Sequence, residues 1–226
     1  MKGSVSRREG EYQGNLFYPL IEACRSENSW EEIAANCRLT RSGDPMSWVF
    51  ALDEGIIAWR ACDRQGRPAL LTWYDGPSVI GIPEVLLGTE APADLVTLTQ
   101  CKLVRVPGPT FRALVSELDD FLLRTIVHRL ASEVYTYMLR IRSLQLLNAD
   151  EMFLDYLREQ VTRVRPLTNE RVRRVGLPLT HAQMAEWLGV SPQYFSQILA
   201  RLEEEGVLRR EKGWLLVQED LVSKEL

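Results

Sequence analysis

The segment 179–208 constrains this chain more than any other, because two short helices and a tight turn can be read from it. Thr180 and Gln183 have the T-x-x-Q spacing of an N-terminal capping box, so a helix is expected to begin at His181. Gly189 follows at the point where a chain leaving a helix often needs a left-handed residue. The turn is therefore placed at 189–191.

A second helix is predicted directly after this turn. Ser191 is a favourable N-cap, and Pro192 stands at the first helical position, where its missing N–H costs nothing. Gly206 ends the helix. The apolar residues keep the i, i+3, i+4, i+7 spacing of one buried face, and they are Phe195, Ile198, Leu199 and Leu202.

The other face of the second helix is polar and mostly uncharged. Glutamine amides can pair with adenine in the major groove of DNA, while hydroxyl groups suit a base edge or a phosphate. We expect this face, with the two capping hydroxyls, to contact DNA. Its predicted residues are Thr180, Ser191, Gln193, Tyr194, Ser196, Gln197 and Arg201.

After the second helix, 207–217 reads as two alternating strands around a turn at Lys212 and Gly213. This wing carries Arg209, Arg210 and Lys212, which we expect near DNA phosphates. Caps, turn and basic wing together indicate a winged helix-turn-helix. A helical hairpin without DNA binding is the alternative for the same pattern.

Short apolar runs alternate with turn-forming clusters between residues 30 and 107. Four clusters stand out, at 42–45, 53–55, 63–66 and 75–77, and a last strand is expected at 96–106. This spacing predicts many short antiparallel strands. A closed or nearly closed barrel would satisfy their edges and leave an interior for one small ligand.

A long helix at 119–147 carries an apolar heptad repeat. One helix cannot bury such a seam against itself, so either the barrel or a second copy of the chain must cover it, and the 3.5-residue period favours a parallel homodimer. The seam residues are Leu123, Val127, Leu130, Val134, Tyr137, Ile141 and Leu144.

Asn148 begins a new helix cap, with Glu151 at the capping-box position. The predicted class is therefore α+β, with an N-terminal antiparallel barrel at 1–118, a dimerisation helix at 119–147 and a winged helix-turn-helix at 148–226. The segment 163–178 holds five arginines and is expected to supply a small strand pair. Those arginines are either phosphate contacts or a solvated face.

Charge and composition limit the remaining classes. The net charge of −4 argues against a protein that coats nucleic acid indiscriminately, although 163–214 has nine Lys/Arg against six Asp/Glu. No run of about 18 apolar residues is present, and 1–15 lacks the apolar core of a signal peptide, so a cytoplasmic protein that does not enter the membrane is expected.

Metal and thiol chemistry have little support in the sequence. Cys24, Cys37, Cys62 and Cys101 show no C-x-x-C spacing, so reduced thiols are expected, with an iron–sulfur or zinc site from all four as the alternative. Only two histidines occur, His128 and His181, both on expected helices. A barrel oxygenase would need two or three in the barrel, so an enzyme is not expected.

Barrel, heptad helix, bend and winged helix-turn-helix, in this order, resemble the CRP/FNR family of bacterial transcription regulators. The resemblance covers nearly the whole chain. It implies a cyclic-nucleotide-binding-like jelly roll, double-stranded DNA with a near-palindromic operator, and RNA polymerase as a partner. The motifs that carry it are Gly43-Asp44-Pro45, VFALDEGII, DRQGR, Asp75-Gly76, Ile80-Gly81, Glu84-Val85-Leu86-Leu87, NADE and LTHAQMAEWLGVSPQYFSQILARLEEEGVL.

The resemblance also bears on the effector. Members that bind cyclic AMP hold its phosphate with a Gly-Glu-Leu turn and an Arg-Ser pair, whereas this chain has Gly81-Ile82-Pro83 and, at 90–94, no arginine and an added carboxylate. Cyclic AMP is therefore not expected, nor haem, which needs a barrel histidine. An aromatic, weakly charged pocket for another small molecule is expected at Trp59, Trp73, Tyr74, Gly81, Ile82, Glu84, Tyr137 and Met138. The alternative is that the aromatic side chains only fill the core.

The recognition helix departs from the family pattern as well. Well-known members have Arg, Glu and Arg where this chain has Pro192, Gln193 and Gln197, so a guanine-centred half-site is not expected. The prediction is a homodimeric, sequence-specific regulator that senses an unidentified signal. Three alternatives remain: a ligand-independent regulator, a thiol-based redox sensor, and a ligand-binding subunit that acts on a protein partner.

Overall fold

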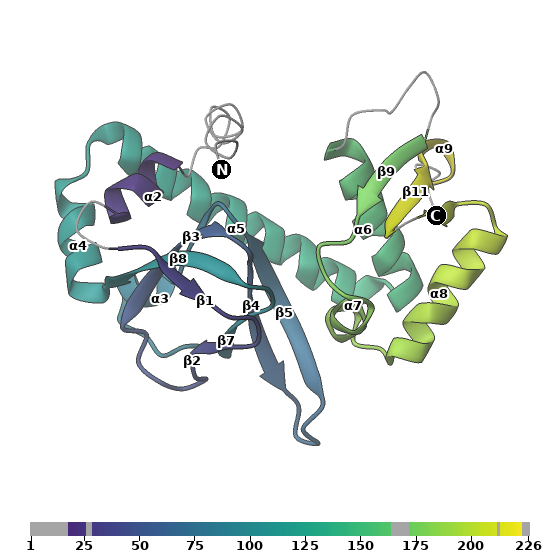
Figure 1. The fold of residues 1–226 in the computed structure, drawn as a ribbon, viewed down its shortest axis with the longest axis horizontal. Coiled ribbons are helices and arrows are strands. Elements are labelled where there is room, and N and C mark those ends of the chain that lie inside the picture. Colours follow the sequence, from purple (N-terminus) through teal and green to yellow (C-terminus); the bar gives the residue numbers. More distant parts are fainter. Residues whose placement is uncertain (1–17, 26–28, 164–171, 212, 223–226) are drawn as a thin grey trace, which may run out of the picture. The chain divides into compact units, whose positions relative to one another are not determined.

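The computed structural model describes residues 18–25, 29–163, 172–211 and 213–222 (Figure 1). The chain divides into two compact units, Met1–Tyr135 and Thr136–Leu226. The long helix α5 (Asp120–Leu146) runs through the boundary between them. This boundary falls inside the helix that the sequence analysis places between two domains.

Among the described residues, the first unit contains two four-stranded sheets, and the neighbouring strands in them pair antiparallel. One sheet has the order β1 (Glu31–Ile33), β8 (Cys101–Pro107), β3 (Trp48–Glu54), β6 (Ser78–Ile80). The other has the order β2 (Arg38–Thr40), β7 (Asp94–Thr97), β4 (Ile56–Cys62), β5 (Pro68–Asp75).

The antiparallel jelly roll expected from the sequence is confirmed. Between the described strands, however, no ladder joins one sheet to the other, so the barrel is not closed. Strands β3 and β4 are buried over most of their length because both of their faces are covered. The core between the sheets contains fully buried Phe50, Leu52 and Ile57, with Phe111 from a neighbouring helix.

The last strand of the jelly roll was predicted as one segment, 96–106, and this prediction is wrong. Two strands occupy the region, because the chain changes sheets at 98–100: β7 pairs with β4, whereas β8 pairs with β3. Thr99 stabilises the crossing, since its hydroxyl accepts a hydrogen bond of 2.9 Å from the backbone N–H of Ile56. The alternation of apolar residues does not reveal such a change of sheet.

Within the described residues, three short helices accompany the jelly roll. Helix α2 (Tyr18–Arg25) buries Leu20 and Ile21 in the core. Helix α3 (Ile82–Leu87) begins after Gly81, whose φ of 90° suits glycine. Helix α4 (Gly108–Glu117), which the sequence analysis missed, begins directly after β8 and has a proline in its first turn.

The second unit combines helices with a small sheet. Its elements are α6 (Ala149–Arg163), β9 (Val172–Gly176), α7 (His181–Leu188), α8 (Pro192–Glu204), β10 (Leu208–Glu211), β11 (Trp214–Gln218) and α9 (Glu219–Val222). The predicted two-stranded wing is incomplete, because β9 pairs with β11 and makes a three-stranded sheet. Of the strand pair expected at 163–178, the described residues contain the strand β9, and 164–171 lies outside them.

The core of the second unit is aromatic. Phe153 of α6 and Phe195 of α8 are both fully buried and meet edge to face, with ring centroids 5.1 Å apart. Tyr156 meets Trp187 of α7 in the same geometry at 5.6 Å. Such pairs add specific geometry to the burial of apolar area, so α6, α7 and α8 are fixed to one another.

The predicted seam of α5 is mostly exposed in a single chain. Leu130 packs against the jelly-roll core, whereas Val127, Val134 and Ile141 are 58%, 59% and 55% exposed. Leu123, Tyr137 and Leu144 are exposed as well. An apolar stripe of this length on one helix is characteristic of a surface that another chain covers.

Gly55→Ala should destabilise the first unit far more than Gly66→Ala does. Both glycines have positive φ, 101° and 78°, so each alanine costs about 1–2 kcal/mol. Only at Gly55 would the new Cβ collide, 2.4 Å from the Gln100 carbonyl oxygen and 2.7 Å from the Cys101 sulfur. Overpacking adds a further cost of about 1–3 kcal/mol. Urea denaturation measures the difference, and equal losses would contradict it.

Candidate nucleic-acid interface

Helix α7 begins and ends as the sequence predicts. The backbone N–H of Gln183 donates to the Thr180 hydroxyl at 3.3 Å, and the backbone N–H of Thr180 donates to Gln183 Oε1 at 2.9 Å. The capping box is therefore complete. Gly189 closes the helix in the left-handed conformation, with φ of 72°. These local contacts fix the angle at which the chain turns into α8.

Helix α8 has the predicted cap and the predicted buried face. The Ser191 hydroxyl accepts a hydrogen bond of 3.1 Å from the Tyr194 backbone N–H, and the four apolar residues of the face are 3% exposed or less. At about 100° per residue, Gln193 and Gln197 point opposite this face, with Ala200 and Glu204. Both glutamines are exposed.

One flank of α8 is turned toward α6. The Tyr194 hydroxyl donates to Asp150 Oδ2 at 3.0 Å, and the Arg201 guanidinium forms an ion pair with the Asp150 carboxylate. Asp150 belongs to the first turn of α6. Two residues predicted to contact DNA therefore share one carboxylate of their own domain.

The other flank of α8 contacts the wing. Arg210 of β10 donates to Glu203 through its backbone N–H at 2.9 Å and through Nε at 2.8 Å. These hydrogen bonds lower the pKa of Glu203 below its usual value. The hydrogen bonds from Arg210 hold the wing against the recognition helix. Within α8, the Ser196 hydroxyl donates a hydrogen bond of 3.0 Å to the Pro192 carbonyl oxygen.

Arg209 and Lys212 are the other two cations of the wing that the sequence places near DNA phosphates. Arg209 is 73% exposed at its side chain and lies 3.2 Å from Glu211. Lys212 lies outside the described residues. On β9, Arg173 pairs with Glu219 at 2.5 Å and Arg174 lies over the Trp214 ring, so these two arginines have structural partners.

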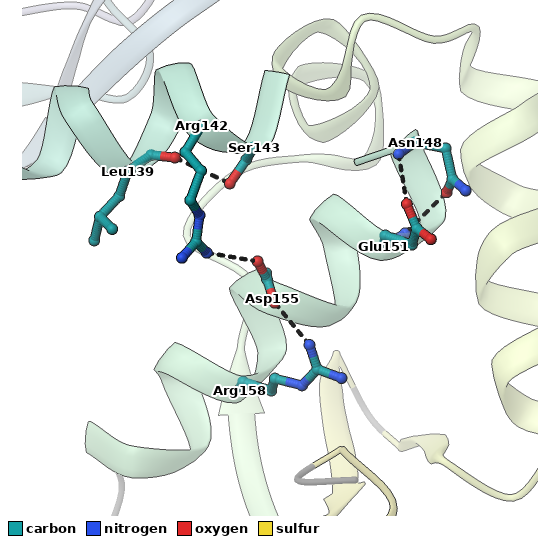
Figure 2. Close-up of polar contacts among 7 residues, drawn as sticks. All are labelled: Leu139, Arg142, Ser143, Asn148, Glu151, Asp155 and Arg158. Atoms are coloured by element: carbon teal, nitrogen blue, oxygen red, sulfur yellow. Dashed lines mark hydrogen bonds and ion pairs between the residues drawn. The ribbon is translucent and has the colours of Figure 1, made fainter. Parts of the chain in front are cut away.

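The corner between α5 and α6 is built from capping and ion-pair contacts (Figure 2). The backbone N–H of Asn148 donates to Glu151 Oε2 at 2.7 Å, and Asn148 Oδ1 accepts from the Glu151 N–H at 3.1 Å, which confirms the predicted box. Asp155 of α6 pairs with Arg142 of α5 at 3.4 Å and with Arg158 at 2.7 Å. The end of α5 is thus attached to α6.

A second contact attaches α5 to α7. Arg140 lies over the Trp187 ring, 4.3 Å from its centroid, and donates to the Trp187 carbonyl oxygen. Burial lowers the pKa of Arg140 to about 10, so the guanidinium remains charged at neutral pH. A cation beside the C-terminal carbonyls of α7 is favourably placed with respect to the helix dipole.

Comparison with known proteins agrees with both halves of this structure. Residues 30–117 match the model of the cyclic nucleotide-binding domain, and residues 152–221 match that of the Crp-like helix-turn-helix domain. The regulatory protein YeiL of Escherichia coli O157:H7 is 25% identical over 182 residues, which cover 79% of this chain and 76% of that protein. The chain belongs to the CRP/FNR family.

Solved structures support the same fold for this transcription regulator. The c-di-GMP-responsive regulator CLP of Xanthomonas campestris has a TM-score of 0.71 at 16% identity, covering 88% of this chain and 98% of its own. A CooA mutant of Carboxydothermus hydrogenoformans has a TM-score of 0.73 at 16% identity, covering 93% and 90%. At such identities the likeness concerns the fold.

The predicted effector residues of the first unit lie in and around its core. Trp59 and Tyr74 are 4% and 8% exposed and pack with other core residues. Ile82 is buried at the start of α3, and Trp73 is half-buried on β5. Tyr137 and Met138, which belong to the second unit, are 37% and 63% exposed. The pocket itself stays a prediction.

Polar groups near Tyr74 were missed in the sequence. Its hydroxyl donates to Glu133 of α5, and Arg129 of the same helix lies 5.3 Å from its ring centroid. Arg129 and Glu133 are 3.9 Å apart, and both are largely buried. A cation therefore stands beside the predicted pocket although 90–94 contains no arginine. Burial, and then repulsion by Glu133, raise the pKa of Glu84.

Asp94, the carboxylate added at 90–94, has a structural role. Asp94 accepts a hydrogen bond of 2.8 Å from the Ser42 N–H and pairs with Arg38 at 3.3 Å, so it joins β7 to β2 and the turn that follows it. The sequence analysis noted this aspartate only as the carboxylate added at 90–94, where the cyclic AMP binders have their Arg-Ser pair. Its two partners lie more than 50 positions away along the chain, which no local pattern indicates.

The described residues include all four cysteines. All four cysteines are free of disulfides. Burial raises the pKa of Cys24 to about 12 and also raises that of Cys101, which disfavours their reactive thiolates. In the described part of the chain no set of three His, Cys, Asp or Glu side chains is arranged to hold a metal ion. None of its helices has the length and apolar character that crossing a membrane requires.

Glu84→Gln should raise the melting temperature at about pH 7.5 by about 2 °C or more, with Glu90→Gln, at an exposed site, as control. The pKa of Glu84 is higher in the folded than in the unfolded state, so its charge costs stability at neutral pH. That cost vanishes as the pH falls below the unfolded value, and the gain should shrink at about pH 4. A gain that does not depend on pH would contradict this reading.

Proposed function

We propose that this regulator is a homodimer that reads a near-palindromic DNA sequence and whose jelly roll responds to a small molecule. In the complex, two copies of α8 would lie in successive major grooves on one side of the duplex. RNA polymerase is the expected protein partner, as the family resemblance implies. The proposal concerns the readout, the assembly and the signal, each of which has its own support.

The outward face of α8 carries the proposal. Gln193 and Gln197 are exposed and point away from the buried face of the helix. A primary amide can bond adenine N6 and N7 at once, and each good bidentate pair contributes about 1–3 kcal/mol of discrimination. A preference for A·T pairs at the positions that meet these glutamines follows.

The exposed seam of α5 supports the homodimer. Its apolar residues repeat every 3.5 positions, and a parallel second copy would cover them along one line. Two recognition helices related by this axis would read half-sites one helical turn apart, about 34 Å. A monomer would contact only one half-site, with a correspondingly lower affinity.

Contacts of α5 support its role in transmission. Arg140 and Arg142 lie in the last two turns of α5 and join it to α7 and α6, so a change in α5 would reach the helix-turn-helix directly. An effector shifts the population only if it binds the DNA-competent arrangement more tightly. A few kcal/mol of differential binding is enough to switch occupancy.

The effector proposed for the jelly roll is an apolar or aromatic small molecule other than cyclic AMP. Trp59, Trp73 and Tyr74 supply aromatic surface on neighbouring strands β4 and β5. The phosphate-binding residues of the cyclic AMP binders are replaced at Gly81-Ile82-Pro83 and at 90–94. Arg129 is already close to Glu133, so a phosphate would have to compete with that carboxylate.

Gln193→Ala and Gln197→Ala should each relax sequence preference at single base pairs, by about 1–3 kcal/mol. Arg209→Ala should instead weaken binding to all duplexes about equally and reduce the salt slope by about one phosphate. Fluorescence anisotropy with operator variants at several salt concentrations separates the two effects. Absence of any sequence preference in the unmodified protein would exclude the proposed readout.

Val134→Lys should convert the dimer to a monomer at micromolar concentration, because a charge at a seam position is buried on pairing. Tyr135→Lys is the matched control, since Tyr135 is the next residue, is 63% exposed and lies off the heptad positions. Light scattering after size exclusion reports the mass. Two monomeric variants, or two dimeric ones, would argue against the seam.

A further inference from the structure

The contact between α6 and the recognition helix has a consequence for DNA affinity. Asp150 receives both the Tyr194 hydroxyl, at 3.0 Å, and the Arg201 guanidinium. Its side chain is 21% exposed, whereas that of Arg201 is 49% exposed. The arginine is therefore accessible to solvent, and the carboxylate that neutralises it is more deeply placed.

The geometry of α8 brings these two partners together. Tyr194 and Arg201 are seven positions apart, about two helical turns, so they project from the same flank. That flank is rotated by about 70° from the line of Gln193 and Gln197. The amides thus remain outward, while the phenol and the guanidinium are held toward α6.

Arg201 is one of three described cations predicted to meet DNA, and each of the three has a carboxylate of its own domain nearby. Arg209 lies near Glu211, and Arg210 is bonded to Glu203. The pair with Asp150 differs from these because its carboxylate comes from α6, outside the helix-turn-helix and the wing. It therefore links the DNA-facing helix to the corner beneath α5.

We propose that Asp150 competes with DNA phosphate for Arg201 and so limits the affinity of this regulator for DNA of any sequence. This inference rests on the proposed DNA-binding function. Binding of duplex DNA depends on counterions released when cations meet phosphates. An arginine that a carboxylate already neutralises displaces fewer counterions from the DNA. The carboxylate beside it also repels the incoming phosphate.

Asp150→Asn tests the inference with little change of shape. The asparagine amide oxygen still accepts from Tyr194, and asparagine is tolerated near a helix N-terminus, whereas the negative charge is lost. Glu159→Gln is the matched control, because it removes the same charge from α6 at an exposed residue. Melting curves establish that both variants fold.

Affinity for a random-sequence duplex is measured by anisotropy between low and moderate salt. Asp150→Asn should bind about fivefold more tightly at low salt, and its plot of log K against log salt should be steeper by about 0.9, the contribution of one phosphate. Glu159→Gln should match the unmodified protein. In an Arg201→Gln background, Asp150→Asn should lose most of its effect. Asp150→Ser provides the same test if the asparagine variant melts early.

Unchanged or weaker binding by Asp150→Asn would overturn the inference, as would an equal gain in Glu159→Gln. If the unmodified protein binds operator DNA with sequence preference while Asp150→Asn behaves identically, only this inference fails. If the unmodified protein binds no duplex at low salt, the proposed function fails, and so does the proposed competition between Asp150 and DNA phosphate for Arg201.

Discussion

The exposed apolar stripe of α5 is the constraint on which the account of this regulator depends. Val134, Ile141 and Leu144 are each more than half exposed in a single chain, and covering the exposed part contributes about half of the roughly 1.5–3 kcal/mol that full burial of such a side chain provides. Their 3.5-residue period lets one parallel partner cover them together. Pairing then determines how many recognition helices act at once and how far apart they stand, which the winged domain alone leaves undetermined.

A continuous set of contacts leads from that stripe to the DNA-facing helix. Arg140 and Arg142 attach α5 to α7 and α6, and Asp150 of α6 holds Tyr194 and Arg201 of α8. Phe153 and Phe195 fix the same helices through the core. The signal proposed to reach α5 would therefore move a packed three-helix unit as a body, and not the recognition helix by itself.

Features set by neighbouring residues could be predicted from the sequence. The capping box at Thr180, the Ser191 cap, the Asn148 box and the turns between strands depend on side chains and backbone within a few positions. Partners distant in the chain could not be predicted. Tyr74 bonds Glu133 across 59 positions, and Tyr194 bonds Asp150 across 44. The change of sheet at 98–100 and the addition of β9 to the wing likewise depend on tertiary pairing.

Selection of bound duplexes from a random DNA library tests the central claim most directly, because it reports the number, orientation and spacing of the sites that one protein assembly reads. Paired recognition helices predict two inverted half-sites about 10–10.5 base pairs apart, centre to centre, with A·T pairs at the positions that meet Gln193 and Gln197. A single half-site, a direct repeat or no enrichment would contradict the account.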